Sequence, residues 1–134
     1  MYLKGKNIFI VEDNLSNSTI MKVILQASGA KVFHDRTTID TVARMKEAGH
    51  VDLVIMDLML SNGLTGYDVF EKLKADPQLC TIPAIVVSAS DPALEMNKAR
   101  TKGFAGYIAK PINNYTFAKH IAAVLDGQQI WGDD

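Results

Sequence analysis

Several features that mark specialised proteins are scarce in this sequence. It holds a single cysteine, Cys80, so no internal disulfide can form, as is usual in a reducing compartment. Lys and Arg number 14 against 15 Asp and Glu, and the resulting net charge of -1 gives no cationic excess for neutralising nucleic acid. The apolar runs, such as Ile8–Val11, are far too short to span a bilayer.

Other absences bear on location and domain count. Segment 1–6 lacks the apolar core of a signal peptide, and no repeat, low-complexity segment or linker divides the chain. We therefore expect a cytoplasmic location and no nucleic acid or membrane as partner. We also expect one domain over 1–134, with its core at about 6–126 and a short tail at 127–134. With 134 residues, 48% of them apolar, the chain can bury a core without disulfides.

The sequence does contain a regular alternation of short apolar runs and segments with helical spacing. Five runs lack polar alternation, which is typical of strands covered on both faces. They are Ile8–Val11, the weaker Lys31–His34, Leu53–Met56, Ala84–Val87 and Gly106–Ala109. Strands that alternate with helices predict the α/β class, with a five-stranded parallel sheet wound doubly by helices on both faces.

Cap and turn residues set the expected helix boundaries. Asp91-Pro92 predicts a helix start, and Gly29 and Gly103 predict helix ends. A third helix is expected over about 67–75, because the residue before Pro77 disfavours helix. Thr37 or Thr38 is the expected N-cap of the second helix.

Apolar spacing also predicts which helix face is buried. The expected buried residues are Ile20, Val23, Ile24 and Ala27 in the first helix, Ile39, Val42, Ala43 and Met45 in the second, and Phe117, Ile121, Val124 and Leu125 in the last.

Four of the predicted strands end at polar residues suited to phosphate chemistry. Glu12 and Asp13 follow the first strand, Asp57 the third, Ser88 the fourth and Lys110 the fifth. In open α/β sheets, ligands bind outside the carboxyl ends of the strands, so these side chains are expected to converge.

The charge of this set implies a cation and a reaction. Three carboxylates at close range raise one another's pKa unless a cation neutralises them, and their oxygen atoms suit Mg²⁺. Zinc is disfavoured because His34, His50, His120 and Cys80 are expected to lie outside this edge. A carboxylate can act as the nucleophile that forms an aspartyl phosphate, while a lysine and Mg²⁺ stabilise the transferring group.

This set of residues resembles the receiver domain of bacterial two-component response regulators. The matching motifs are Glu12-Asp13-Asn14, Asp57, Ser88-Ala89 and Lys110-Pro111, spread over about 6–126. The resemblance implies a flavodoxin-like (CheY-like) fold with strand order 2-1-3-4-5 and a cis Lys110-Pro111 peptide. The sequence departs from the usual family pattern at Ser61, where proline is common, and in loop 61–66, which is one residue longer.

The resemblance also implies roles for individual residues. Asp57 would be the phosphoacceptor, and Mg²⁺ would be held by Glu12, Asp13, Asp57 and the backbone carbonyl of Met59. The phosphoryl group would be met by Ser88 and Lys110, in a pocket completed by Ala89 and Pro111. Tyr107 would be an aromatic switch that turns inward when Ser88 engages phosphate.

The implied function is a signalling switch, and not an enzyme beyond its own phosphorylation and dephosphorylation. The phosphoryl donor would be a histidine kinase or a histidine phosphotransfer protein. A downstream protein would then bind the changed surface around the fifth strand and its flanking helices. We expect a monomer or weak dimer. The chain ends soon after the last helix, which favours a stand-alone receiver, although a receiver excised from a larger kinase fits the sequence too.

Alternatives come from other classes of protein. A Mg²⁺-dependent phosphohydrolase could use the same aspartyl phosphate, but such enzymes usually carry a second Asp where this chain has Met59. A nucleotide- or flavin-binding domain is disfavoured because neither GxxxxGK[ST] nor GxGxxG is present. Trp131 lies in the tail, which is expected either to fray or to dock on a partner or a second copy.

Overall fold

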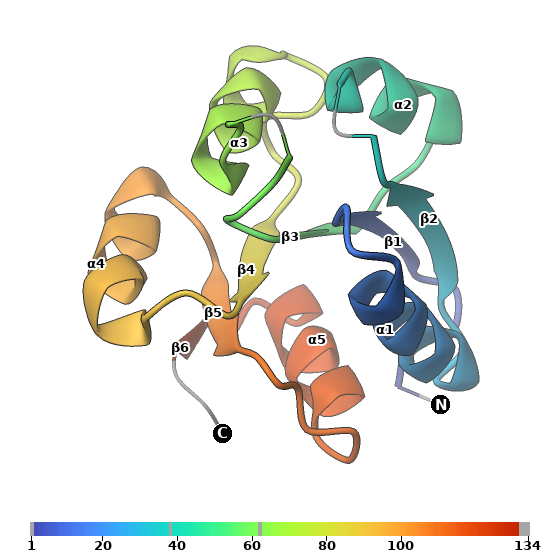
Figure 1. Ribbon diagram of the computed structural model, residues 1–134. Coiled ribbons are helices and arrows are strands. Elements are labelled where there is room, and N and C mark those ends of the chain that lie inside the picture. The colour runs from blue at the N-terminus through green and yellow to red at the C-terminus, as the bar shows by residue number, and fades with distance from the viewer. Residues whose placement is uncertain (1, 38, 62, 132–134) are drawn as a thin grey trace.

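The computed structural model describes residues 2–37, 39–61 and 63–131, in which strands and helices alternate along the chain (Figure 1). The strands are β1 (Asn7–Val11), β2 (Lys31–Asp35), β3 (Leu53–Met56), β4 (Ala84–Ser88), β5 (Gly106–Ala109) and β6 (Ile130–Trp131). The helices are α1 (Leu15–Ala27), α2 (Thr41–Ala48), α3 (Gly66–Ala75), α4 (Pro92–Lys102) and α5 (Phe117–Leu125). Within the described residues, no helix is both long and apolar enough to cross a membrane.

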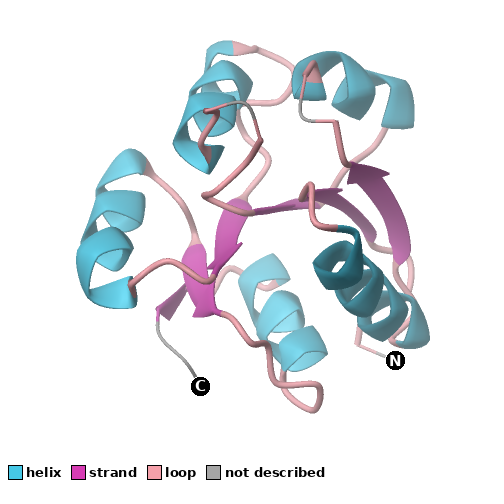
Figure 2. Cartoon of the chain, in the orientation of Figure 1, coloured by secondary structure: helices cyan, strands magenta, loops and turns pink. Residues whose placement is uncertain are grey.

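The strands form one parallel sheet in the order β2-β1-β3-β4-β5-β6. The predicted α/β class, the flavodoxin-like fold and the order 2-1-3-4-5 are confirmed, and the short strand β6 is an addition to them. Figure 2 shows the strands at the centre of the molecule with helices around them. The reversal of strand order lies between β1 and β3, so the loops after these two strands flank the expected binding edge.

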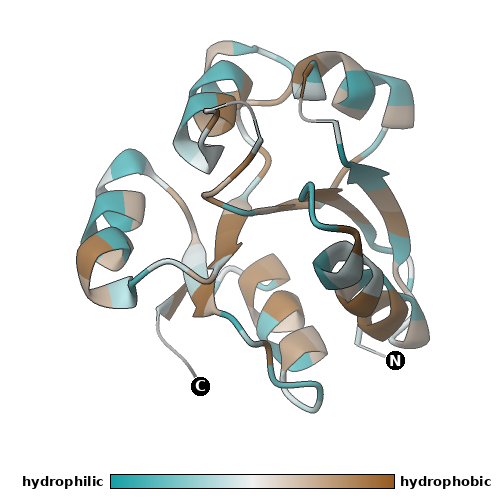
Figure 3. Ribbon diagram, viewed as in Figure 1, coloured by the Kyte–Doolittle hydropathy of each residue, from teal (hydrophilic) through white to brown (hydrophobic). Residues whose placement is uncertain are grey.

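Each strand supplies side chains to two separate cores, one on each face of the sheet. On one face, alternate strand residues such as Val54 and Val86 pack with α2, α3 and α4. On the other face, their neighbours Ile55 and Ile85 pack with α1 and α5. The strands accordingly are the brown, hydrophobic centre of Figure 3. Because both faces are covered, no polar alternation is needed, which explains the unbroken apolar runs.

Several local predictions about helix boundaries are confirmed. The Asp91 side chain accepts a hydrogen bond from the Ala93 N–H, which caps α4, and Gly103 ends that helix in the left-handed region. Helix α3 ends at Ala75, before Asp76 and its proline. Gly29 also has a positive φ of 100°, as expected for a residue that follows a helix.

The predicted buried face of α1 is wrong. Ser18, Met21 and Leu25 face the sheet, whereas Ile20 and Val23 are 48% and 59% exposed. Ala27 is exposed as well, and Ile24 is half-buried. The predicted set and the buried set both follow the i, i+3, i+7 spacing of one helix face. The helix buries the face that contains the longer Met and Leu side chains. The apolar residues of α1 therefore divide between the core and the surface.

The predicted start of α2 is also wrong. Asp40, and not Thr37, is the N-cap: its carboxylate accepts from the Ala43 N–H. Thr37 instead donates its hydroxyl to Asp35, whose buried carboxylate also accepts from Thr41. The other proposed cap, Thr38, lies outside the described residues. Ile39 precedes the helix and is 75% exposed, so it is not the core residue that its spacing predicted.

The expectation of a frayed tail is wrong for its first part. Ile130 and Trp131 pair in parallel with Gly106 and Tyr107 of β5, which places β6 at the sheet edge. This approach needs a glycine, because a Cβ at Gly106 would lie 2.7 Å from the Ile130 carbonyl oxygen. The guanidinium of Arg100 on α4 lies 4.6 Å from the centre of the Trp131 ring.

We predict that Gly106→Ala releases β6 from the sheet, because the new Cβ meets backbone that cannot move away while the strand stays paired. The cost should be about 1–3 kcal/mol of unfolding free energy. Trp131 is the only tryptophan, so its fluorescence reports the release as a red shift.

Gly49→Ala is the matched control. It forces alanine to a φ of 84° in open space, so it should cost about 1–3 kcal/mol while leaving Trp131 emission unchanged. Unchanged emission in Gly106→Ala would contradict the docking of β6.

Candidate functional site

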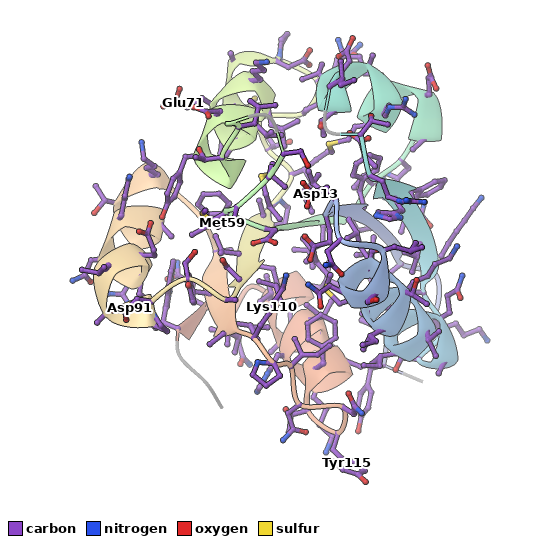
Figure 4. The ribbon with its side chains drawn as sticks, in the orientation of Figure 1. Asp13, Met59, Glu71, Asp91, Lys110 and Tyr115 are labelled. Atoms are coloured by element: carbon purple, nitrogen blue, oxygen red, sulfur yellow. The ribbon has the colours of Figure 1, made fainter. Side chains whose placement is uncertain are left out.

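Backbone hydrogen bonds bring the predicted site residues to one edge of the sheet. The Asp57 N–H donates to the carbonyl of Val11 at 3.1 Å, and the Lys110 N–H donates to the carbonyl of Ser88 at 2.9 Å. The carboxyl ends of β1, β3, β4 and β5 thus lie side by side. Figure 4 labels Asp13, Met59 and Lys110, which come from three separate loops at this edge.

Lys110 joins two of the predicted carboxylates. Its Nζ lies 2.6 Å from Glu12 Oε1 and 3.1 Å from Asp57 Oδ2. Glu12 is fully buried, and the side chains of Lys110 and Asp57 are 13% and 11% exposed. The second Asp57 oxygen, Oδ1, accepts from the Met59 N–H at 3.3 Å. Both carboxylate oxygens of Asp57 therefore accept a hydrogen bond, and the side chain stays near the surface.

The two carboxyl groups have opposite pKa shifts. Burial, with the hydrogen bond to Asp57, raises the pKa of Glu12 to about 7. Burial also pushes the pKa of Asp57 upward, but the hydrogen bond from Glu12 and the charge of Lys110 outweigh it, so this pKa is lowered. Burial disfavours the Lys110 ammonium, yet its two carboxyl partners raise its pKa overall. The arrangement therefore favours an ionised Asp57, which is the form a nucleophile needs.

Ser88 and Tyr107 are linked through Ser90. The Ser88 hydroxyl, which is fully buried, donates to Ser90 Oγ at 3.1 Å and accepts from the Ser90 N–H at 3.2 Å. Tyr107 is fully buried as well, and its hydroxyl donates to the Ser90 carbonyl at 3.0 Å. Burial is the main cause of the raised pKa of Tyr107. The Tyr107 ring is thus already in the inward position while Ser88 is hydrogen-bonded to Ser90, so the inward turn that the family resemblance implied does not start from this structure.

Asp13 does not join the other two carboxylates. Its Oδ2 accepts a hydrogen bond from the hydroxyl of Ser61, in the loop after β3. Among the described residues, no three His, Cys, Asp or Glu side chains lie close enough to hold a metal ion. The predicted convergence therefore holds for Glu12, Asp57 and Lys110, and Asp13 lies beside them.

One observation tests whether these residues suit Mg²⁺. Glu12 Oε2 is buried and has no hydrogen-bond partner among the described residues. A buried carboxyl oxygen without a partner is costly, and a metal-bound water would satisfy it. Met59 directs its side chain outward, at 68% exposure, while its backbone lies next to Asp57. The donor set of carboxylates and carbonyl is therefore suitable for Mg²⁺.

The loop between β3 and α3 is fixed beside Asp57 by a glycine and a capping box. A Cβ at Gly66 would lie 2.3 Å from the Asp57 carbonyl oxygen, so only glycine fits there. Thr65 and Asp68 exchange side-chain and backbone hydrogen bonds at the start of α3. The loop departs from the usual family sequence at Ser61, and that residue is the one bonded to Asp13.

Two residues near the site were missed from the sequence. His34 Nε2 lies 2.9 Å from the Glu12 carbonyl oxygen, so the expectation that all three histidines lie outside this edge is wrong for His34. Asp35 is 1% exposed and lies 3.4 Å from the Arg44 guanidinium nitrogen Nε. Asp35 ends β2 as Glu12 follows β1, so the rule of polar strand ends could have found it.

Comparison with known proteins agrees with this geometry. The family model of the response regulator receiver domain matches residues 8–122. The chain therefore belongs to the receiver-domain family of two-component signalling, whose members are signalling switches.

Individual relatives cover nearly the whole chain. The polar-differentiation response regulator DivK of Brucella ovis is 32% identical over 120 residues, which are 90% of this chain and 96% of the relative. The receiver domain of a signal transduction histidine kinase from Syntrophus aciditrophicus has a TM-score of 0.77 at 31% identity, covering 92% of each chain. The chemotaxis response regulator CheY4 of Vibrio cholerae, at 19% identity and a TM-score of 0.79 over 89% of this chain and 98% of its own, supports the fold alone.

We predict that Lys110→Ala destabilises the protein by roughly 3 kcal/mol, because it leaves Glu12 and Asp57 buried together without a counter-charge. Urea unfolding measures this loss. Adding Asp57→Asn to Lys110→Ala should restore much of the stability, because it removes the carboxylate that the lost lysine leaves without a counter-charge.

Lys102→Ala is the control variant. Lys102 lies 3.7 Å from Glu71, which is 70% exposed, so its loss should cost about 0–1 kcal/mol. Equal losses for the two lysine variants would rule out a structural role for the Lys110 ion pairs.

Proposed function

We propose that the chain is a phosphorylation-dependent switch and that Asp57 is its phosphoacceptor. The observation that carries this proposal is the position of Asp57: its carboxylate is held by Lys110 and the Met59 N–H, and its side chain is partly open to solvent. The donor is the phosphohistidine of a histidine kinase or a histidine phosphotransfer protein. The site lies in the cytoplasm, where such donors are found.

In the proposed transfer, an Asp57 carboxylate oxygen forms a bond to phosphorus as the P–N bond of the phosphohistidine breaks. The electron pair of that bond goes to the imidazole nitrogen, which then takes a proton from solvent. Lys110 exchanges Asp57 for a phosphoryl oxygen, and Ser88 turns its hydroxyl from Ser90 to another phosphoryl oxygen. Ala89 is exposed and small, and with Pro111 it leaves space for the group.

Mg²⁺ would be held by Asp13, Asp57 and the Met59 carbonyl, with Glu12 acting through water. When bound, it supplies positive charge that offsets the negative phosphoryl oxygens. Asp13 would leave Ser61 to join these ligands.

The signal would leave through Tyr107 and the surface of α4, β5 and α5. When Ser88 turns to the phosphoryl group, its hydrogen bonds with Ser90 are lost, and the Tyr107 hydroxyl is anchored on that same residue. A local change of charge would thus bias the conformation of this surface, where a downstream protein binds. The phosphohydrolase alternative gains no support, because the exposed Met59 offers no proton donor.

We predict that acetyl phosphate with Mg²⁺ adds one phosphoryl group to the protein, and that Asp57→Asn prevents the addition, because the amide is not a nucleophile. Intact-mass measurement detects the product. Asp91→Asn is the matched control: it changes an exposed Asp to an equally good helix cap and should be labelled normally. A phosphorylated Asp57→Asn protein would refute the assignment.

We also predict that labelling depends on Mg²⁺ through Asp13. Removal of the metal with EDTA should abolish labelling, and Asp13→Asn should raise the Mg²⁺ concentration for half-maximal labelling at least about tenfold. Asp40→Asn, which preserves the α2 cap, serves as control. A wild-type Mg²⁺ dependence in Asp13→Asn would remove this residue from the ligand set.

A further inference from the structure

The edge of the sheet at β5 would be open without the last strand. Strand β5 pairs with β4 on one side, and on the other side, within the described part of the chain, it pairs with the two-residue strand β6. An uncovered edge presents a row of backbone N–H and C=O groups, which is a template for another strand. In Figure 1, β6 lies beside β5 at the end of the sheet nearest α4.

The two residues of β6 use both faces of this edge. Trp131 packs with the core that contains Tyr107 and faces α4, and Ile130 packs with the core on the α5 face. The ring of Trp131 also receives the Arg100 guanidinium at 4.6 Å. The edge thus offers one place for an aliphatic side chain and one for an aromatic side chain.

The edge is shaped for close approach of a strand. At Gly106 a Cβ would lie 2.7 Å from the Ile130 carbonyl oxygen and 3.4 Å from the Ile130 N. Any side chain on residue 106 would therefore push the added strand away.

The contact between the tail and the rest of the protein is small. Up to residue 131, where the described part of the chain ends, two residue pairs join β6 to the sheet, and both Ile130 and Trp131 are half-buried. Segment 126–129, which leads to β6, is exposed. Displacement of the tail therefore requires little rearrangement of the rest of the fold.

Charge indicates what else fits this edge. The last turn of α4 carries Arg100 and Lys102, with Arg100 exposed beside the Trp131 ring. The sequence of the tail itself runs Ile-Trp-Gly-Asp-Asp. An extended segment with an aliphatic residue, an aromatic residue and then acidic residues matches both the pairing and the charge of α4.

We propose that β5 and α4 form a strand-docking site that Ile130 and Trp131 occupy within the chain, and that a partner enters by displacing them with such an extended segment. Binding is by addition of a strand to the sheet edge. The inference deepens the proposed function, because it names the class of partner for the surface of α4, β5 and α5. The tail then competes with the partner for this surface.

The test uses the full-length chain with its tail released by two substitutions, Ile130→Ser and Trp131→Ser. The probe is a synthetic peptide of residues 128–134, Gln-Gln-Ile-Trp-Gly-Asp-Asp. Titration is followed by the backbone amide NMR shifts of Gly106, Tyr107 and Arg100. A peptide of the same composition in scrambled order is the control for non-specific binding.

We expect the peptide to shift these three amides in the released-tail protein, in which the site is free. In the wild-type chain the tail competes at an effective concentration on the order of millimolar, so the peptide should bind at least about tenfold more weakly. Adding Gly106→Ala to the released-tail protein should abolish binding and cost less thermal stability than in the wild-type chain, since only the 3.3 Å contact with Ile85 Cγ2 then remains.

Three outcomes would overturn the proposal: no shift of these amides at millimolar peptide, equal binding to the wild-type chain, or equal binding of the scrambled peptide. The titration is done without a phosphoryl donor. Its result is therefore independent of Asp57 labelling, and failure of one proposal is distinguishable from failure of the other.

Discussion

The functional edge depends on the contacts of one ammonium group with two buried carboxyl groups. Lys110 lies between Glu12 and Asp57 and offsets a repulsion that burial would otherwise make severe. The sheet holds Glu12 with no exposure and leaves Asp57 near the surface, so the proton favours Glu12 and the negative charge favours Asp57. The same contacts thus stabilise the fold and favour the ionised form of Asp57.

The sequence was sufficient for the parallel sheet, because strands buried on both faces carry apolar runs such as Ile8–Val11 with no polar alternation. It was also sufficient to predict that Glu12, Asp57 and Lys110 meet at one edge of the sheet, since each follows a strand. The buried face of α1 could not be predicted, because Val23 and Met21 lie on different faces and both are apolar. Only packing against the sheet determines which of the two faces is buried. The start of α2 was missed because the Thr37 hydroxyl donates to Asp35 at the end of β2, and Asp40 caps the helix instead.

The position of Asp13 shows a further limit of sequence reasoning. The shared sheet edge predicted that it joins the other carboxylates, but in the structure it accepts a hydrogen bond from the Ser61 hydroxyl in loop 61–66. Strand β6 was missed for a related reason: a strand of two residues gives no periodic signal, and its place depends on the absence of a side chain at Gly106. In both cases a residue distant in sequence, Ser61 for Asp13 and Gly106 for β6, determines the position.

The ion pairs of Lys110 have a consequence for the order in which the protein is made. They join residues separated by 98 and 53 positions, so Glu12 and Asp57 both leave the ribosome well before their common cation. Until residue 110 emerges, closing this edge would bury two acids side by side. The nascent chain therefore gains an Asp57 paired with its lysine only when β5 has joined the sheet.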